Sequence, residues 1–425
     1  MALINLIFYP KTIVRNRKYF WRKGATIAVS NHPNTLFDPL AVAVRLNRVV
    51  HFLVNAGLYK SRAMAWFLNE TYGIKVERKQ DVGDKKLSNE FAFQQAAKFL
   101  SGGGCLYSAV EGGSDIPRRL RKVKTGTARI ALTTEAMNNF QLGLEILPVG
   151  LNYSSQTEFR SHLFINAAEP IRVAEFKESF EKDNFQAALE LTAEIEKRLE
   201  NVLIDTVDNE EDAFLRKLEA VAETEQKLPL VATWERSKKL LRAWQDLKNQ
   251  NPKEASEFQD KVEEYFDFLE KNKTRDRVFR KIQKSGFQLN WWIRTIFLII
   301  GFPVFLYGWL NNFLANYIPA WANKKMNLHI AYTSTIKILV GIFTYLIFYG
   351  IQIWLVKYFF QDIRITWGYI VSLLLAGVFA WRYHDFAKDT LSGWRLSGAL
   401  KKGKNTAREY FEDRNSIVKK INDAL

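Results

Sequence analysis

Cysteine, histidine and methionine are scarce in this chain. Its 425 residues include one cysteine, five histidines and four methionines. The lone thiol of Cys105 can form neither an internal disulfide nor a cysteine-based zinc site, and it fits a reducing compartment. The three glycines at 102–104 lack the Gly-Lys-Ser/Thr ending of a nucleotide-binding P-loop, so we interpret them as a turn. A disulfide scaffold and a P-loop at this segment are therefore excluded.

Charge is missing from three long windows near the C-terminus. Residues 295–323, 338–356 and 365–381 contain no Asp, Glu, Lys or Arg. A membrane-spanning helix needs about 20 apolar residues, with a range of about 17–25. The first window contains Gly301 and Pro303, which fit a kinked span, a re-entrant hairpin or an interfacial helix. We predict a membrane region at 290–382 with two to three apolar helices, in which the second and third windows cross and the first does not fully cross.

Cations outnumber carboxylates, with 61 Lys and Arg against 45 Asp and Glu, a net charge of +16. The densest basic run, 271–284, lies just before the first window, and the tail at 383–425 is rich in lysine. Positive flanks of membrane helices face the cytoplasm. We therefore expect the N-terminal domain and the C-terminus on the cytoplasmic side of a bacterial inner membrane or its equivalent. Anionic head groups explain such a run, so membrane lipids, and no nucleic acid, are the expected partners.

Residues 1–205 alternate between strand-like and helical patterns. The β-rich runs are 26–30, 49–54, 73–77, 104–109 and 145–152, and helical patterns occupy 89–100 and 185–202. The last helix is expected to bury Phe185, Leu189, Thr192, Ile195, Leu199 and Val202, which recur at helical spacing. Such alternation is typical of a mixed sheet covered by helices. We predict an α/β domain over 1–205.

Residues 206–289 are dense in charge and poor in β-branched residues. Two helical stripes run from Trp234 to Leu247 and from Phe258 to Leu269. Asn251-Pro252 between them is typical of an N-cap followed by proline at the first helical position. We predict a charged helical hairpin or linker over 206–289, followed by the membrane region and a basic cytoplasmic tail at 383–425.

The segment Asn31-His32-Pro33-Asn34-Thr35-Leu36-Phe37-Asp38-Pro39 directly follows the strand-like run 26–30. An imidazole can accept a proton near neutral pH, and a nearby carboxylate can fix its tautomer. A substrate hydroxyl can then be the nucleophile without an intervening serine. Asp38 also fits the N-cap of a helix over 39–45, so both interpretations stay open. On an ideal helix His32 and Asp38 share no face, so their contact requires the loop between them to fold back.

Three further segments lie in or directly after predicted strands. Residues 73–78 end in Arg78, and residues 110–114 read Val-Glu-Gly-Gly-Ser, with small residues where a ligand can approach the backbone. Residues 146–152 form an apolar strand that Pro148 is expected to break. In order and spacing, the four segments resemble the four boxes of the glycerol-phosphate acyltransferase superfamily, over about residues 25–200.

The resemblance implies specific roles. His32 is the general base, Asp38 orients it, and Arg78 binds the acceptor phosphate, whose oxygens match a guanidinium fork. Glu111 and Gly112 shape the acceptor site, with Gly113 and Ser114 completing this substrate-binding loop. From the small residues themselves, and not from the resemblance, we expect backbone amides near 111–113 to stabilise the oxyanion. No metal and no cofactor are implied, only acyl-CoA or acyl-ACP as the co-substrate.

The chain departs from the common pattern at two points. Five residues separate His32 from Asp38 where the common first box has four, and Ser114 stands where the common third box has an arginine. Arg118 and Lys124 are our candidates to replace that arginine in phosphate or donor contacts, with a lipid-facing basic strip as the alternative. In both features the chain looks more like the yeast-type glycerol-3-phosphate and dihydroxyacetone-phosphate acyltransferases.

We therefore expect a membrane-bound enzyme of phosphatidic acid, and hence phospholipid, biosynthesis. It would transfer a fatty acyl group from acyl-CoA or acyl-ACP to glycerol-3-phosphate or dihydroxyacetone phosphate. A 1-acylglycerol-3-phosphate is the alternative acceptor, because it too presents a phosphate and a hydroxyl. A catalytically silent lipid-binding membrane protein is the second alternative, because two boxes depart from the common pattern.

Overall fold

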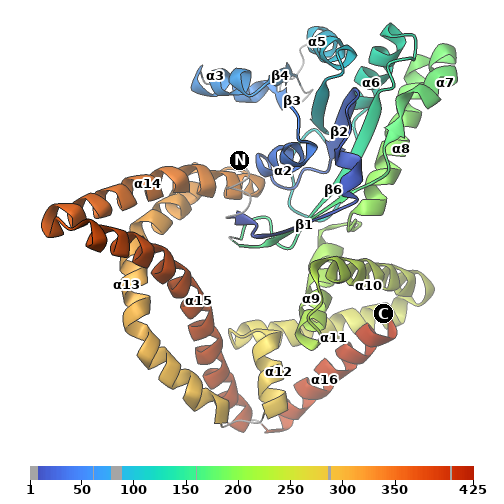
Figure 1. Cartoon of the computed structure of the whole chain (residues 1–425). Coiled ribbons are helices and arrows are strands. Elements are labelled where there is room, and N and C mark those ends of the chain that lie inside the picture. Colours follow the sequence, from blue (N-terminus) through green and yellow to red (C-terminus); the bar gives the residue numbers. More distant parts are fainter. Residues whose placement is uncertain (1–7, 61, 78–88, 159, 286–288, 403) are drawn as a thin grey trace. The chain divides into compact units, whose positions relative to one another are not determined.

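The computed structural model describes residues 8–60, 62–77, 89–158, 160–285, 289–402 and 404–425 (Figure 1). The chain divides into two structural units. Unit 1 contains residues 1–209 and 329–335, and unit 2 contains residues 210–328 and 336–425. The short segment 329–335 therefore belongs to the N-terminal unit, although it joins two long apolar helices. The predicted boundaries at 205, 289 and 382 stay predictions.

A mixed β-sheet forms the centre of unit 1. Its strands are β1 (Lys11–Arg15), β2 (Thr26–Ser30), β3 (Val50–Asn55), β4 (Gly73–Val76), β5 (Cys105–Ala109), β6 (Glu145–Tyr153), β7 (His162–Ala167) and β8 (Ile171–Arg172). The strand order is β1-β7-β6-β2-β5-β3-β4, and β8 pairs with β6. Strand β2 is parallel to β5 and β6, whereas β6 and β7 are antiparallel. The predicted mixed sheet is confirmed, but β1, β7 and β8 were not predicted.

The central strand β2 is buried along its whole length. Ile27, Ala28 and Val29 have no exposed surface. A strand covered on both faces reads as a continuous apolar run, as this one does, because neither face meets water. Asn31 and His32 directly follow the carboxyl end of β2. They are therefore held at the middle of the sheet.

Pro148 does not break β6, contrary to the prediction. The strand continues from Glu145 to Tyr153. Pro148 lies between the residues that pair with β8 and those that pair with β7. Its missing N–H therefore costs no bond in either ladder, while its carbonyl accepts a hydrogen bond from Ala168 N at 2.9 Å.

Helices flank the sheet in unit 1. They are α2 (Phe37–Leu46), α3 (Arg62–Glu70), α5 (Glu90–Ser101), α6 (Gly126–Met137), α7 (Lys177–Lys182) and α8 (Asn184–Val202), with short 3-10 turns η1 (Arg17–Phe20), η2 (Ala56–Lys60) and η3 (Val173–Phe176). The predicted buried face of α8 is partly wrong, because Phe185 is 64% and Leu189 is 40% exposed. Ala187, Ala188 and Leu191 are buried instead. Small residues let α8 approach the sheet, where a Cβ on Gly150 would lie 2.5 Å from Val202 O.

Unit 2 begins with charged helices and includes a helical pair. They are α9 (Asn209–Glu225), α10 (Leu230–Gln250), α11 (Pro252–Lys271), α12 (Asp276–Ser285) and the C-terminal α16 (Lys404–Asp423). Helices α10 and α11 pack together as the predicted hairpin. Asn251 caps α11, because its side chain accepts a hydrogen bond from Glu254 N at 3.3 Å.

Three apolar helices complete the described chain. They are α13 (Leu289–Met326), α14 (Thr333–Phe360) and α15 (Ile363–Lys402), and each is long and apolar enough to cross a membrane. Helix α13 is continuous through Pro303 and Pro319, which excludes the re-entrant hairpin considered for the first window. Helices α13 and α15 run side by side in Figure 1. A Cβ on Gly308 would lie 2.3 Å from Ala376 O, so this glycine permits the close approach.

Candidate active site

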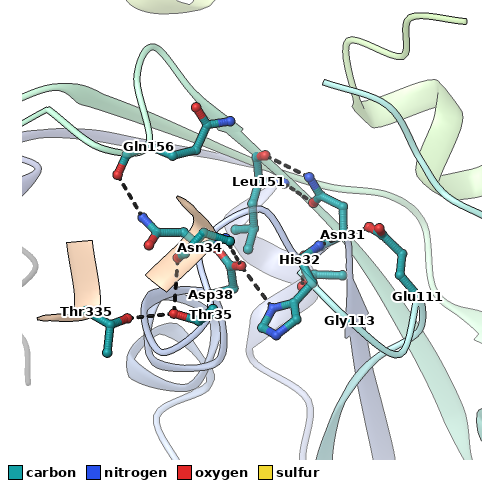
Figure 2. Close-up of polar contacts among 12 residues, drawn as sticks. Asn31, His32, Asn34, Thr35, Asp38, Glu111, Gly113, Leu151, Gln156 and Thr335 are labelled. Atoms are coloured by element: carbon teal, nitrogen blue, oxygen red, sulfur yellow. Dashed lines mark hydrogen bonds and ion pairs between the residues drawn. The ribbon is translucent and has the colours of Figure 1, made fainter. Parts of the chain in front are cut away.

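The register of three parallel strands brings the first and third sequence motifs together. Ser30 at the end of β2 is level with Ala109 of β5 and Val149 of β6. His32 and Glu111 each lie two residues beyond those paired positions. Because the carboxyl ends of parallel strands meet at one edge, these side chains become neighbours, and His32 N donates to Glu111 Oε1 at 3.0 Å (Figure 2).

His32 and Asp38 are in direct contact, as Figure 2 shows. The distance from His32 Nδ1 to Asp38 Oδ2 is 3.0 Å. The histidine side chain is 17% exposed, whereas the carboxylate has no exposed surface. The loop from 33 to 37 therefore folds back, as the contact required. Asp38 is not the N-cap of the following helix, because α2 begins at Phe37 and places Asp38 in its first turn.

Two further donors hold the Asp38 carboxylate. Asn34 N donates to Oδ2 at 2.6 Å, and Tyr153 Oη donates to Oδ1 at 2.7 Å. Burial, together with the Asp38 charge, raises the pKa of Tyr153 well above its usual value. The phenol therefore keeps its proton and remains a donor at neutral pH. With the imidazole, three groups fix a carboxylate that only accepts.

Glu111 links the histidine loop to a basic segment. Its Oε2 accepts a hydrogen bond from Arg121 Nε at 2.9 Å. A terminal guanidinium nitrogen of Arg121 also donates to Gly113 O. Burial raises the pKa of Glu111, and the bonds from Arg121 and from His32 N oppose that rise. This carboxylate therefore fixes the loop that carries His32 and holds one guanidinium beside it.

The predicted small-residue segment forms a tight turn. Gly112 has a φ of +70°, a conformation that favours glycine. Its N–H donates to Ala109 O at 3.2 Å, so that amide is already engaged within the turn. Gly113 and Ser114 follow and are partly exposed.

The structure brings Arg121, and neither Arg118 nor Lys124, to Glu111. The carbonyl of Arg118 accepts hydrogen bonds from Thr206 N and Oγ1 at 2.8 and 3.0 Å. Lys124 is exposed, and its N–H donates to Val110 O at 2.9 Å. Arg78 lies outside the described residues. No periodicity marks Arg121, because residues 112–124 form no regular element.

Sequence reasoning also missed the groups outside residues 31–38 that hold this loop in place. The side chain of Asn31 exchanges two hydrogen bonds with the Leu151 backbone, at 2.8 and 3.0 Å. Tyr9 Oη donates to Gln156 O at 3.1 Å and contacts the Asn34 amide. Asn31 adjoins the histidine in the sequence, but nothing in the sequence pairs it with β6.

The segment joining α13 to α14 also contacts this loop within unit 1. It contains the 3-10 turn η4 (Ile330–Tyr332) and the start of α14. Thr335 Oγ1 lies 2.6 Å from Thr35 Oγ1, as Figure 2 shows. Ser334 Oγ donates to Gln156 O. Thr35 has a φ of +21°, so the hydrogen bond holds a residue in an uncommon conformation.

Within the described ranges, no three His, Cys, Asp or Glu side chains gather in a way that could hold a metal ion. The expectation that the reaction needs no metal and no cofactor stays a prediction. The chemistry available from the described residues is acid–base chemistry at His32, backed by a buried carboxylate.

Residues 11–152 match the family model described as Acyltransferase. The chain is 28% identical over 170 residues to glycerol-3-phosphate O-acyltransferase 2 of Saccharomyces cerevisiae. That match covers 39% of this chain and 22% of the yeast protein. It therefore supports a shared domain and spans about a fifth of the relative's length.

Among solved structures, the crystal structure of the 1-acyl-sn-glycerophosphate (LPA) acyltransferase PlsC from Thermotoga maritima matches with 18% identity and a TM-score of 0.32. The match covers 46% of this chain and 75% of that one. A superposition at this level gives no argument about the substrate.

Proposed function

Residues 11–152 form a domain of the Acyltransferase family, and from this premise we propose that the chain transfers a fatty acyl group from a thioester to a hydroxyl of a glycerol-phosphate acceptor. The observation that carries the proposal is the 3.0 Å contact between His32 Nδ1 and a fully buried Asp38. Glycerol-3-phosphate or dihydroxyacetone phosphate is the proposed acceptor, and acyl-CoA or acyl-ACP is the proposed donor.

His32 acts as the general base in this proposal. When Nδ1 donates to the ionised Asp38, Nε2 keeps its lone pair and can accept the proton of the acceptor hydroxyl. The acceptor oxygen then attacks the thioester carbonyl, a C–O bond forms, and the thiolate leaves with its electron pair. Asp38 stabilises the imidazolium formed in that step. The protonated histidine can then return its proton to the leaving thiolate.

Arg121 is the described cation best placed for the acceptor phosphate. Its Nε is held by Glu111, and its side chain is 31% exposed. A guanidinium has five N–H donors in a planar fork, so the two bonds to Glu111 and Gly113 leave donors for phosphate oxygens. Arg78, Arg118 and Lys124 remain proposed contacts of the phosphate or of the donor, and Gly113 and Ser114 remain proposed parts of the substrate loop.

The catalytic unit is proposed to face the cytoplasm, with α14 and α15 crossing the membrane. The described residues contain no membrane-length apolar helix before α13, so α13 begins on the side of unit 1. The segment 329–335, which follows α13, belongs to unit 1 and contacts Thr35. This contact supports a placement of both ends of α13 on one side, and with it two crossings. The basic run at 271–284 supports the cytoplasmic side.

An acyl-transfer assay tests the function. Membranes containing the full chain are incubated with radiolabelled acyl-CoA or acyl-ACP and, in turn, glycerol-3-phosphate, dihydroxyacetone phosphate and 1-acylglycerol-3-phosphate. General-base catalysis contributes about 10²–10⁴-fold, so His32→Ala should lose at least about 100-fold with the preferred acceptor. Lys182→Ala, at an exposed lysine of α7, is the control.

Three outcomes separate the alternatives. Lysophospholipid product from glycerol-3-phosphate or dihydroxyacetone phosphate supports the proposed acceptor. Turnover with 1-acylglycerol-3-phosphate alone assigns the alternative acceptor. Lipid binding without turnover by the wild type, or full activity in His32→Ala, would sink the catalytic proposal.

A further inference from the structure

An open groove of about 1380 Å³ lies in unit 2. In the sequence it is far from residues 31–38, the candidate catalytic loop. Residues from α9, α11, α12, α13 and α15 line it. In Figure 1, α12 lies beside the C-terminal part of α15. The groove therefore forms where the charged helices of the unit meet the apolar ones.

Positive charge predominates in this groove. Among the described lining residues, nine are lysine or arginine and six are aspartate or glutamate. Several of the carboxylates are already bound to cations. Asp385 accepts from Arg275 and Arg277, each at 2.8 Å, and Asp276 accepts from Arg414 at 2.7 Å. Lysine and arginine therefore remain in excess among the described lining residues, which include Lys227 and Arg382.

Lys281 shows the consequence of gathering these charges. Three cations, Arg294, Arg277 and Lys227, act on it electrostatically, together with one carboxylate, Asp389. Burial lowers the pKa of the Lys281 ammonium, the three cations lower it further, and Asp389 opposes them. An anion in the groove would relieve this repulsion.

The groove adjoins an apolar surface of membrane length. Ile293, which lines it, is 63% exposed, and Ile296, Phe297, Ile299 and Ile300 continue the exposed surface along α13. Arg294 lies over the Phe386 ring at 4.3 Å and donates to Thr390 Oγ1 at 3.0 Å. Cation–π stacking and this hydrogen bond hold the Arg294 guanidinium where the groove meets the apolar surface of α13.

We infer that this groove binds the phosphate head group of an anionic phospholipid whose acyl chains lie against the apolar surface of α13. The groove supplies cations for the phosphate, and the surface beside it supplies contact for the acyl chains. A soluble phosphate would use the cations but gain nothing from the apolar surface. The inferred site lies outside the catalytic loop and does not depend on turnover.

Native mass spectrometry of the detergent-purified full chain tests the inference. The probes are phosphatidate, phosphatidylglycerol, phosphatidylcholine and inorganic phosphate. The variant is Lys227→Glu/Lys281→Glu, which reverses two charges of the groove. The control is Lys182→Glu/Lys253→Glu, which makes the same charge change at exposed lysines of α7 and α11. His32→Ala is included because it removes the proposed base and leaves the groove intact.

The wild type, the control and His32→Ala should bind the two anionic lipids with similar affinity and phosphatidylcholine more weakly. The groove variant should lose about tenfold or more in affinity for the anionic lipids, since each cation near an anionic lipid contributes appreciably. Equal affinity in the groove variant and the control would overturn the site. Tight binding of inorganic phosphate that also depends on Lys281 would overturn the lipid assignment. Thermal melting of each variant checks that the fold is retained.

Discussion

At the scale of single residues, the candidate site depends on a buried carboxylate with three donors. Asp38 has no exposed surface, and His32, Asn34 and Tyr153 all contact it. A buried charge is tolerated when its hydrogen bonds are complete. The same bonds that satisfy the Asp38 carboxylate fix the orientation of the imidazole.

Asp38→Asn should reduce kcat at least about 100-fold while the chain stays folded. The amide keeps the shape of the carboxylate but cannot stabilise an imidazolium, and it favours the wrong tautomer of His32. Single-turnover acyl transfer with saturating donor measures the chemical step. A variant that retains wild-type rates would show that Asp38 only supports the fold.

Glu111 should make stability depend on pH. Burial raises the pKa of Glu111 in the folded state. The pKa of a glutamate in the unfolded chain is about 4.3. The folded chain therefore takes up this proton at a higher pH than the unfolded chain does. Lowering the pH through the folded pKa therefore favours the folded state. Relative to Glu111→Gln, the wild type should gain thermal stability as the pH falls from 7 to about 4.3. A constant difference in Tm across that range would contradict this expectation.

At the scale of elements, the segment joining α13 to α14 does more than connect two helices. Its Thr335 and Ser334 contact Thr35 and the Gln156 carbonyl, which lie on or beside the catalytic loop. The start of α14 thus takes part in holding the His32–Asp38 geometry.

Thr335→Val should lower kcat about fivefold, because a hydrogen bond contributes about 1 kcal/mol net. Thr335→Ser keeps the hydroxyl and should restore the rate. Thr224→Val, at a partly exposed threonine of α9, is the matched control. Initial rates with membranes of equal protein content provide the comparison. Equal rates in all three variants would mean that the contact does not support catalysis.

Gly308→Ala should separate α13 from α15. The added Cβ would lie 2.3 Å from the Ala376 carbonyl oxygen, which belongs to backbone and cannot move alone. Overpacking costs about 1–3 kcal/mol, so the thermal midpoint in detergent should fall. Gly350→Ala on α14, where nothing lies within 4 Å, should leave the midpoint nearly unchanged. Equal midpoints for the two variants would rule out close packing at Gly308.

At the scale of the whole molecule, chain connectivity supports the proposed number of crossings. A polar chain leads from unit 1 to α13, and 329–335 returns to unit 1. In the proposed topology, α14 and α15 cross as a pair and α13 does not fully cross.

Cysteine labelling tests that topology. Cys105 is fully buried, and burial raises the pKa of its thiol to about 11, so its background reactivity should be low. In sealed vesicles of known orientation, Lys325→Cys should react with an impermeant maleimide only from the side of the catalytic unit. Arg364→Cys, in the first turn of α15, should react only from the opposite side. Labelling of both positions from one side would refute two crossings.

Much of this protein follows from local patterns. The apolar run of β2, the helical stripes and the three uncharged windows predicted their elements, because burial and membrane insertion depend on the side chains within one segment. The spacing of the four motifs was likewise enough to propose His32 and Asp38. Errors arose where packing decides which face is buried, as with Phe185 and Leu189 on α8.

Tertiary structure alone decided which distant groups meet. The loop between His32 and Asp38 has no periodicity, and its folding back depends on Tyr153, 115 residues away from Asp38. Arg121 reaches Glu111 through an irregular segment, and Thr335 reaches Thr35 across 300 residues. Such contacts depend on strand order and register, which no short stretch of sequence encodes. The residue types needed for the chemistry were therefore readable from the sequence, whereas their partners were set only by the sheet and by the segment packed against it.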